Sequence, residues 1–170
     1  MSELIFSFEQ SKLDLQDIPV NVDQLLFNHC INSIVKDYRM ECKIKNITVK
    51  EMYDPSISQV NMDRVILDTI FTIVFHNIVT HMQDGIISVH TSLENSETIC
   101  LYIRTNMKVF DNGMEEIQHA FDSEQVSNNT YFLGFYKANM LVKRLGGSGI
   151  ECNENASGGV TFRILLPNSE

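Results

Sequence analysis

Four cysteines are the residues of this 170-residue chain whose chemistry can be judged from spacing alone. A structural zinc site takes Cys and His ligands in closely spaced pairs, and a redox pair takes the pattern C-x-x-C. Cys30, Cys42, Cys100 and Cys152 are widely separated, and none has a partner at zinc-ligand spacing. They are therefore predicted to be buried free thiols, as is typical of a protein in a reducing cytoplasm.

Charge and hydropathy exclude two classes of partner. The formal net charge is −9 and the pI is about 4.9, whereas nucleic-acid binding depends on clustered Lys and Arg. The longest apolar run, from Ile70 to Val79, is interrupted by Thr72, His76 and Asn77 and is too short to span a bilayer. We therefore expect no nucleic-acid partner and no direct membrane insertion by this chain.

The elements that position the polar residues follow from hydrophobic periodicity. Alternation of apolar and polar residues predicts strands over Leu4–Phe8, Cys42–Val49, Ile86–Leu93, Thr98–Thr105, Gly149–Asn153 and Val160–Leu166. Apolar residues at three- and four-residue spacing predict helices over Asn21–Tyr38, Met62–Met82, Glu115–Phe121 and Phe132–Leu145. This order predicts an α+β fold, a two-layer α/β sandwich with a mixed sheet and helices on one face, in a single domain over residues 1–170.

The helix over Met62–Met82 is apolar around most of its circumference, so it is predicted to be the central core helix. Asn61 or Asp63 is expected to start it. The predicted core consists of Ile70, Ile73, Val74, Ile78, Leu101, Ile103, Leu141, Leu145, Phe162 and Ile164. The polar stretch from Asp122 to Thr130 has little to bury and is expected to be the most mobile internal segment.

Three segments resemble the ATP-binding domains of sensor histidine kinases, a superfamily that also includes gyrase, mismatch-repair and chaperone ATPases. The first runs from Asp63 to Val79, the second from Phe132 to Gly147, and the third from Gly158 to Pro167. The second and third segments favour histidine kinases over the other branches. The resemblance covers the chain from about Leu4 to Pro167 and implies the histidine-kinase ATPase fold.

In that family the central helix carries an N-x-x-x-N box, whose asparagines hold Mg²⁺ beside the triphosphate. An amide suits this role because its oxygen binds a hard cation without adding charge near the phosphates. The resemblance places Asn77 at the second position, as a cofactor and metal ligand, but Ile73 at the first. Asn77 could instead be a polar cap on an otherwise apolar helix.

The family's next box is D-x-G-x-G, in which the aspartate accepts a hydrogen bond from adenine and the glycines leave room for the ligand. Counted from Gly85 through the hairpin, these positions fall on Thr105, Met107 and Val109. Thr105 could accept only a neutral hydrogen bond, which is weaker than a charge-assisted one. A competing register makes Asp111 the adenine ligand, although its sequence D-N-G is also a common turn.

The second glycine box, G-x-G-L-G, starts a helix whose free amides and dipole receive phosphate in the family. This chain reads T-Y-F-L-G from Thr130 to Gly134, so Gly134 alone is kept as a cofactor-binding position. Phe132 stands at a phosphate-facing position. Tyr131 and Phe132 could equally fold this segment inward as hydrophobic plugs.

No segment has the family's phosphoacceptor pattern, a helical histidine followed by an acidic residue in a dimerisation hairpin. His76 and His81 fall on the core helix, where a packed or capping role is favoured. The resemblance therefore implies a fragment of a larger signalling protein. Its expected partners are the dimerisation and phosphoacceptor helices of the parent kinase and a response regulator.

These observations predict an ATP-binding-type catalytic domain of a two-component sensor histidine kinase whose nucleotide pocket is weakened or lost. No catalytic residue is assigned; ATP and Mg²⁺ are implied by resemblance, with weak or absent binding. The expected location is the cytoplasm, including the cytoplasmic part of a membrane-bound sensor. The alternative is a non-enzymatic module that docks a response regulator or a partner kinase.

Overall fold

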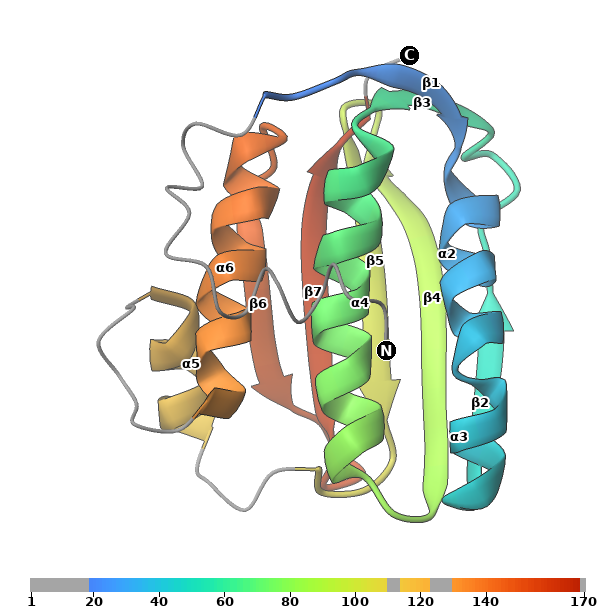
Figure 1. The fold of residues 1–170 in the computed structure, drawn as a ribbon, viewed down its shortest axis with the longest axis vertical. Coiled ribbons are helices and arrows are strands. Elements are labelled where there is room, and N and C mark those ends of the chain that lie inside the picture. Colours follow the sequence, from blue (N-terminus) through green and yellow to red (C-terminus); the bar gives the residue numbers. More distant parts are fainter. Residues whose placement is uncertain (1–18, 110–113, 123–129, 169–170) are drawn as a thin grey trace.

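The computed structural model describes residues 19–109, 114–122 and 130–168. Two layers make up the molecule, a β-sheet and a set of helices that cover one of its faces (Figure 1). The strand predicted over Leu4–Phe8 lies outside the described residues, as does most of the segment from Asp122 to Thr130. The expected mobility of that segment stays a prediction.

The sheet has five strands in the order β2-β4-β5-β7-β6. Its strands are β2 (Ile47–Met52), β4 (Gly85–Asn95), β5 (Thr98–Thr105), β6 (Gly149–Glu154) and β7 (Val160–Pro167). The pairing of β2 with β4 is parallel and the other pairings are antiparallel, so the sheet is mixed. A separate two-stranded ribbon pairs β1 (Asp23–Leu26) with β3 (Gln59–Met62).

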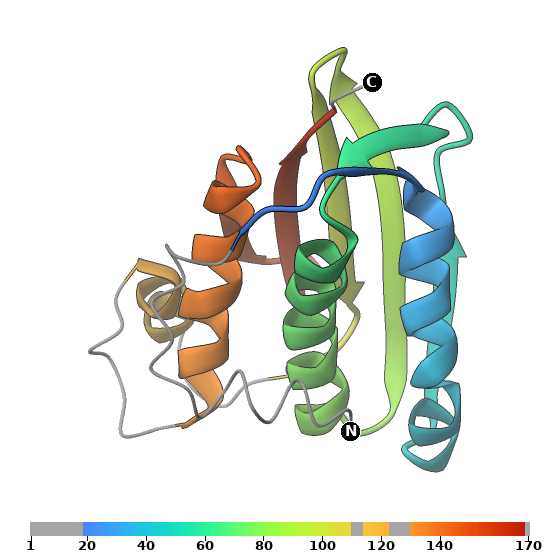
Figure 2. The same ribbon diagram turned by 45° about the horizontal axis from the view of Figure 1, so that its top comes forward.

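Five described helices pack on one face of the sheet, and α4 lies between α2 and α6 (Figures 1 and 2). They are α2 (Phe27–Asp37), α3 (Arg39–Ile44), α4 (Arg64–His81), α5 (Met114–Asp122) and α6 (Thr130–Arg144). The predicted two-layer sandwich is thereby confirmed. No helix among the described residues is both long and apolar enough to cross a membrane.

The core lies between α4 and the sheet, as the apolar circumference of this helix requires. Asp63 starts α4, because its Oδ1 accepts a hydrogen bond from Ile66 N at 3.0 Å. Nine of the ten predicted core residues are buried, and Leu145 is only partly buried. Leu145 directly follows the last residue of α6.

Two predicted elements differ from the structure because pairing partners override local periodicity. The helix predicted from Asn21 begins only at Phe27, since residues 23–26 pair with β3 as a strand. The strand predicted over Cys42–Val49 begins only at Ile47, and Cys42 lies in the short helix α3. Between these two elements, Asn46 has a positive φ of 57°, which ends the helix before the strand starts.

Candidate functional site

Asn77 lies on the buried side of α4, one turn after Ile73. Its side-chain nitrogen donates a hydrogen bond of 2.7 Å to the backbone carbonyl of Ile73. The amide is thus partly used within its own helix, which satisfies its donor group in an apolar setting. Its Oδ1 atom makes no hydrogen bond to the described residues.

Gly134 brings α6 against α4 at this same point. A Cβ atom built on Gly134 would lie 3.1 Å from Ile73 Cγ2 and 3.6 Å from Asn77 Nδ2. These distances leave no room for a larger residue unless Ile73 moves. The structure therefore brings Asn77 and Gly134 together, with the Ile73 side chain between the two helices.

Thr105 ends β5 and is completely buried. Its hydroxyl donates to the carbonyl of Met107 at 2.9 Å and accepts from the backbone nitrogen of Val160 at 2.9 Å. A hydroxyl has a single proton and two lone pairs, so only one acceptor position remains unused. Thr105 therefore ties the end of β5 to the start of β7.

Gly159 and Asn155 complete this tie, and neither was predicted as part of the site. A Cβ atom on Gly159 would lie only 2.2 Å from the carbonyl oxygen of Thr105, so no other residue fits there without a shift of the backbone. Asn155 Nδ2 donates to the same carbonyl at 2.9 Å. The signal in the sequence is the glycine pair Gly158–Gly159 before Val160, which begins the third segment of the resemblance.

The remaining predicted positions are placed as follows. Met107 is 44% exposed, and Val109 is buried in the core. Asp111, the adenine ligand of the competing register, lies outside the described residues, and so does the side chain of Phe132. The choice between Thr105 and Asp111 as the adenine contact stays a prediction.

The two histidines of α4 are packed residues. His76 lies 5.9 Å from the ring of Tyr38 and within 3.3 Å of the Thr80 hydroxyl. Burial lowers the pKa of His81, and the charge of Lys45 nearby acts in the same direction. Both imidazoles are partly buried, which fits the packed role predicted for them.

Magnesium and nucleotide fit these residues only in part. At the junction of α4 and α6, the atom of Asn77 near Gly134 is the amide nitrogen Nδ2, and Ile73 supplies no side-chain oxygen. Among the described residues, no three His, Cys, Asp or Glu side chains gather as a metal site. Magnesium beside a nucleotide takes most of its oxygen ligands from water and phosphate, so a single amide oxygen of the protein would be one ligand among several.

Comparison with solved structures identifies the fold. The catalytic domain of histidine kinase ThkA superimposes with a TM-score of 0.74 at 16% identity, covering 88% of this chain and 97% of that domain. This chain has the fold of a histidine-kinase catalytic domain. Histidine kinase AdeS of Acinetobacter baumannii gives a TM-score of 0.72 at 13% identity, covering 98% of this chain and 75% of AdeS.

The histidine-kinase fold is also found in full-length ShkA, whose structure was determined in complex with AMPPNP. The TM-score is 0.75 at 14% identity, and the match covers 98% of this chain and 35% of ShkA. At the level of sequence, no protein-family model and no curated protein matches the chain. The likeness therefore lies in the arrangement of the elements.

Proposed function

We propose that this chain is the ATP-binding-type catalytic domain of a two-component sensor histidine kinase and that its nucleotide pocket is weakened or lost. The observation that carries the proposal is the contact between α4 and α6. Where the family places two asparagines and a glycine-rich helix start around the triphosphate, this chain packs Ile73 against Gly134. The Ile73 side chain provides no magnesium ligand, and it fills space beside Asn77, the asparagine that is kept.

The adenine end supports the same conclusion. A carboxylate bonded to the adenine amino group contributes on the order of 1.5–3 kcal/mol. In the register that uses Thr105, a neutral hydroxyl replaces it, and two of the three bonding positions of this hydroxyl are already occupied within the fold. A micromolar site of about 8 kcal/mol can lose about 4 kcal/mol before its dissociation constant reaches about 1 mM, and this loss together with the missing first asparagine would use up most of that margin.

The proposed setting is a cytoplasmic signalling protein. The partners are the dimerisation and phosphoacceptor helices of the parent kinase and a response regulator, because the described residues contain no phosphoacceptor hairpin of their own. Four buried free cysteines agree with a reducing compartment. In this setting the domain positions its partners even where it holds nucleotide poorly.

Isothermal titration with Mg-ATP and with Mg-ADP tests the proposal. We expect a dissociation constant at or above about 1 mM, or no measurable heat. Asp111→Ala and Asn77→Ala variants are titrated in parallel, with Asp23→Ala, on the exposed strand β1, as the matched control. Micromolar binding that is lost in Asp111→Ala but kept in Asp23→Ala would overturn the weakened pocket and establish Asp111 as the adenine contact.

A docking module without enzymatic activity is the second candidate. It is favoured by where the substitutions fall, since they affect Ile73, Thr105 and Phe132 while the core between α4 and the sheet is fully packed. Absence of heat with both nucleotides, together with a cooperative unfolding transition, would favour this candidate over a functional kinase domain.

A further inference from the structure

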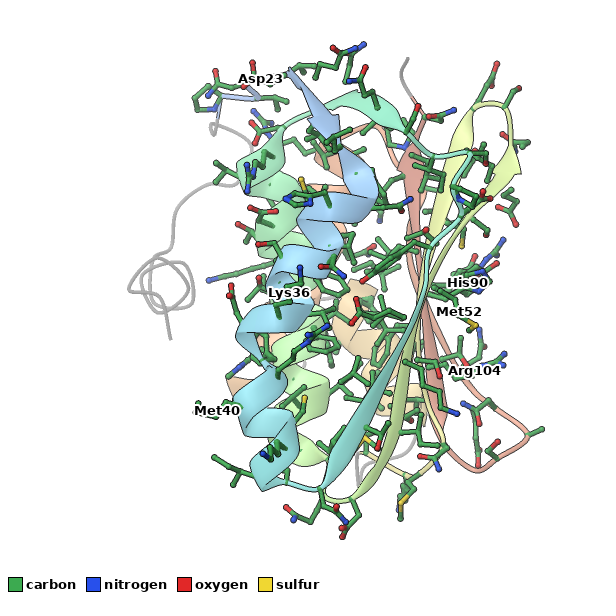
Figure 3. The ribbon with its side chains drawn as sticks, turned by 90° about the vertical axis from the view of Figure 1, so that its right-hand side faces the viewer. Asp23, Lys36, Met40, Met52, His90 and Arg104 are labelled. Carbon is green, nitrogen blue, oxygen red and sulfur yellow. The ribbon has the colours of Figure 1, made fainter. Side chains whose placement is uncertain are left out.

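The face of the sheet that the helices leave open carries a hollow of about 460 Å³. Figure 3 shows Met52, His90 and Arg104 projecting from the sheet on the side away from the helices. The hollow is lined by Met52, Ser88, His90, Ser92, Tyr102 and Arg104, which come from β2, β4 and β5. On the open face of β4 the small residues Ser88 and Ser92 lie on either side of His90. The hollow therefore lies over the strands themselves, above small side chains, and not at a loop. Its volume lies within the range of small-molecule sites.

Positive charge in this hollow is not neutralised by the described part of the protein. The guanidinium of Arg104 makes one hydrogen bond there, from Nε to Thr161 Oγ1 at 3.3 Å, and no ion pair. Lys50 pairs with Ser88 in the sheet, and Ser88 pairs with Arg104 on its other side. The two cations therefore flank one hydroxyl, with backbones about 10 Å apart, and no acidic residue lines the hollow.

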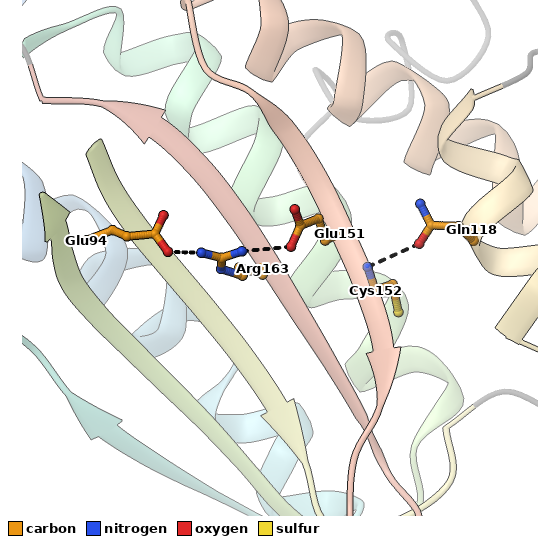
Figure 4. A network of polar contacts seen from close by, with 5 residues as sticks. All are labelled: Glu94, Gln118, Glu151, Cys152 and Arg163. Atoms are coloured by element: carbon orange, nitrogen blue, oxygen red, sulfur yellow. Dashed lines mark hydrogen bonds and ion pairs between the residues drawn. The ribbon is translucent and has the colours of Figure 1, made fainter. Parts of the chain in front are cut away.

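The neighbouring arginine shows the contrast. Arg163, on β7, makes ion pairs with both Glu94 and Glu151, the latter at 2.9 Å (Figure 4). Its charge is thus satisfied within the sheet. Arg104 lies on β5, one strand away from Arg163, and has no acidic partner among the described residues. In a chain with a net charge of −9, this unpaired positive charge creates a local site for an anion.

An aromatic wall borders this positive site. The rings of His90 and Tyr102 stack with a centroid distance of 5.7 Å and an interplanar angle of 30°. Met52 pairs with His90 on the next strand and is 55% exposed, so it adds an accessible apolar surface beside the two rings. The hollow thus combines an apolar, aromatic side with a cationic, hydroxyl-bearing side.

We propose that this open-face hollow binds a small aromatic anion. The ring of the ligand packs against Tyr102 and Met52, and its anionic group is held by Arg104 and the Ser88 hydroxyl, with Lys50 at the rim. Guanidinium and ammonium groups suit carboxylate and phosphate, and an aromatic wall selects a planar ring. The site is on the opposite face of the sheet from α4 and α6, so it is independent of the nucleotide position proposed above.

Titrations followed by the amide signals of β4 and β5 in heteronuclear NMR spectra test the site. Phenyl phosphate and benzoate supply a ring with either anionic group, inorganic phosphate supplies the charge alone, and benzyl alcohol supplies the ring alone. We expect phenyl phosphate or benzoate to shift the signals of Ser88 and His90 with a dissociation constant at or below about 1 mM. The ratio of the two affinities identifies phosphate or carboxylate as the preferred group, and the two single-feature probes should bind at least about tenfold more weakly.

Variants separate the two halves of the site. Arg104→Gln should weaken binding of the aromatic anions by about tenfold or more, since a charge-assisted hydrogen bond is lost. Tyr102→Leu should weaken the aromatic anions but leave inorganic phosphate unchanged. Arg39→Gln removes the same charge from an exposed helix position on the other layer and should have no effect. Equal binding in wild type and Arg104→Gln, or no shift of β4 signals up to 10 mM of either aromatic anion (about tenfold above the expected constant), would overturn the proposal.

Discussion

Thr105, which the sequence resemblance offers as one of two candidate adenine contacts, has a structural role that its hydrogen bonds define. It joins Met107 and Val160 through two hydrogen bonds of 2.9 Å in a buried place. A buried threonine with both partners satisfied stabilises the fold, because each of these backbone groups would otherwise be left unpaired. In the structure Thr105 thus connects the end of β5 to the start of β7.

Replacing Thr105 by Val tests this role. The two side chains have nearly the same shape, but valine leaves the Val160 nitrogen and the Met107 carbonyl without their partner. We expect the free energy of unfolding to fall by about 1–3 kcal/mol in urea titrations. Thr69→Val, at a more exposed position on α4, should change it by no more than about 0.5 kcal/mol. An equal midpoint for wild type and Thr105→Val would show that water replaces the hydroxyl.

At the scale of elements, two sites at the ends of elements connect parts of the fold: the turn before β7 and the start of α4. In the turn, Gly159 lies against the backbone of Thr105, while Gly158 has a positive φ of 75° and no atom near its missing Cβ. At the start of α4, both oxygens of Asp63 accept backbone hydrogen bonds, one from Ile66 and one from Asn21 at 2.7 Å. Each feature joins segments that are remote along the chain.

The two adjacent glycines give a matched pair of variants. Gly159→Ala places a methyl group 2.2 Å from the Thr105 carbonyl oxygen, so the strands must separate. We expect a loss of about 3 kcal/mol or more in the free energy of unfolding. Gly158→Ala meets only the unfavourable φ and should cost about 1–2 kcal/mol. Thermal unfolding of both variants measures these losses. A larger loss in Gly158→Ala than in Gly159→Ala would contradict the close contact between β5 and the turn.

Asp63→Ala removes the cap of α4 and the bond to the segment before β1. We expect a loss of about 1–2 kcal/mol, since capping residues contribute this much at helix starts. Asp37→Ala, at the exposed end of α2, is the control with the same change of charge. Chemical denaturation of both variants, monitored by circular dichroism, measures the difference, and equal losses would argue against the cap.

At the scale of the whole molecule, burial of ionisable groups couples stability to pH. Burial raises the pKa of the Cys152 thiol from an ordinary 9.0 to about 12, and burial, with the charge of Glu41 as a lesser cause, raises that of Tyr38 from 10.0 to about 12. Both groups are neutral when protonated, so the folded state holds its protons more tightly than the unfolded state. Their contribution to stability is present below pH 9 and is lost as the pH rises toward 12.

We therefore expect the free energy of unfolding to fall between pH 9 and pH 12 and to change little through these two groups below pH 9. Urea titrations at pH 8, 10 and 11 measure this slope. Cys152→Ala should be less stable at pH 8 because of the lost packing, but should show a shallower decline with pH. A decline of the same steepness in wild type and Cys152→Ala would assign the alkaline transition to other groups.

Sequence alone determined the parts of this protein that depend on short-range patterns. The helix α4, the strand β5 and the single-sided sandwich follow from the spacing of apolar residues. Tertiary structure decided what depends on partners remote in the chain. Residues 23–26 form a strand because β3 lies beside them, and the Thr105 hydroxyl is occupied because β7 starts there. Arg104 lacks an acidic partner in the described structure while Arg163 has two, because the register of four strands, rather than any local sequence, sets which charges face each other.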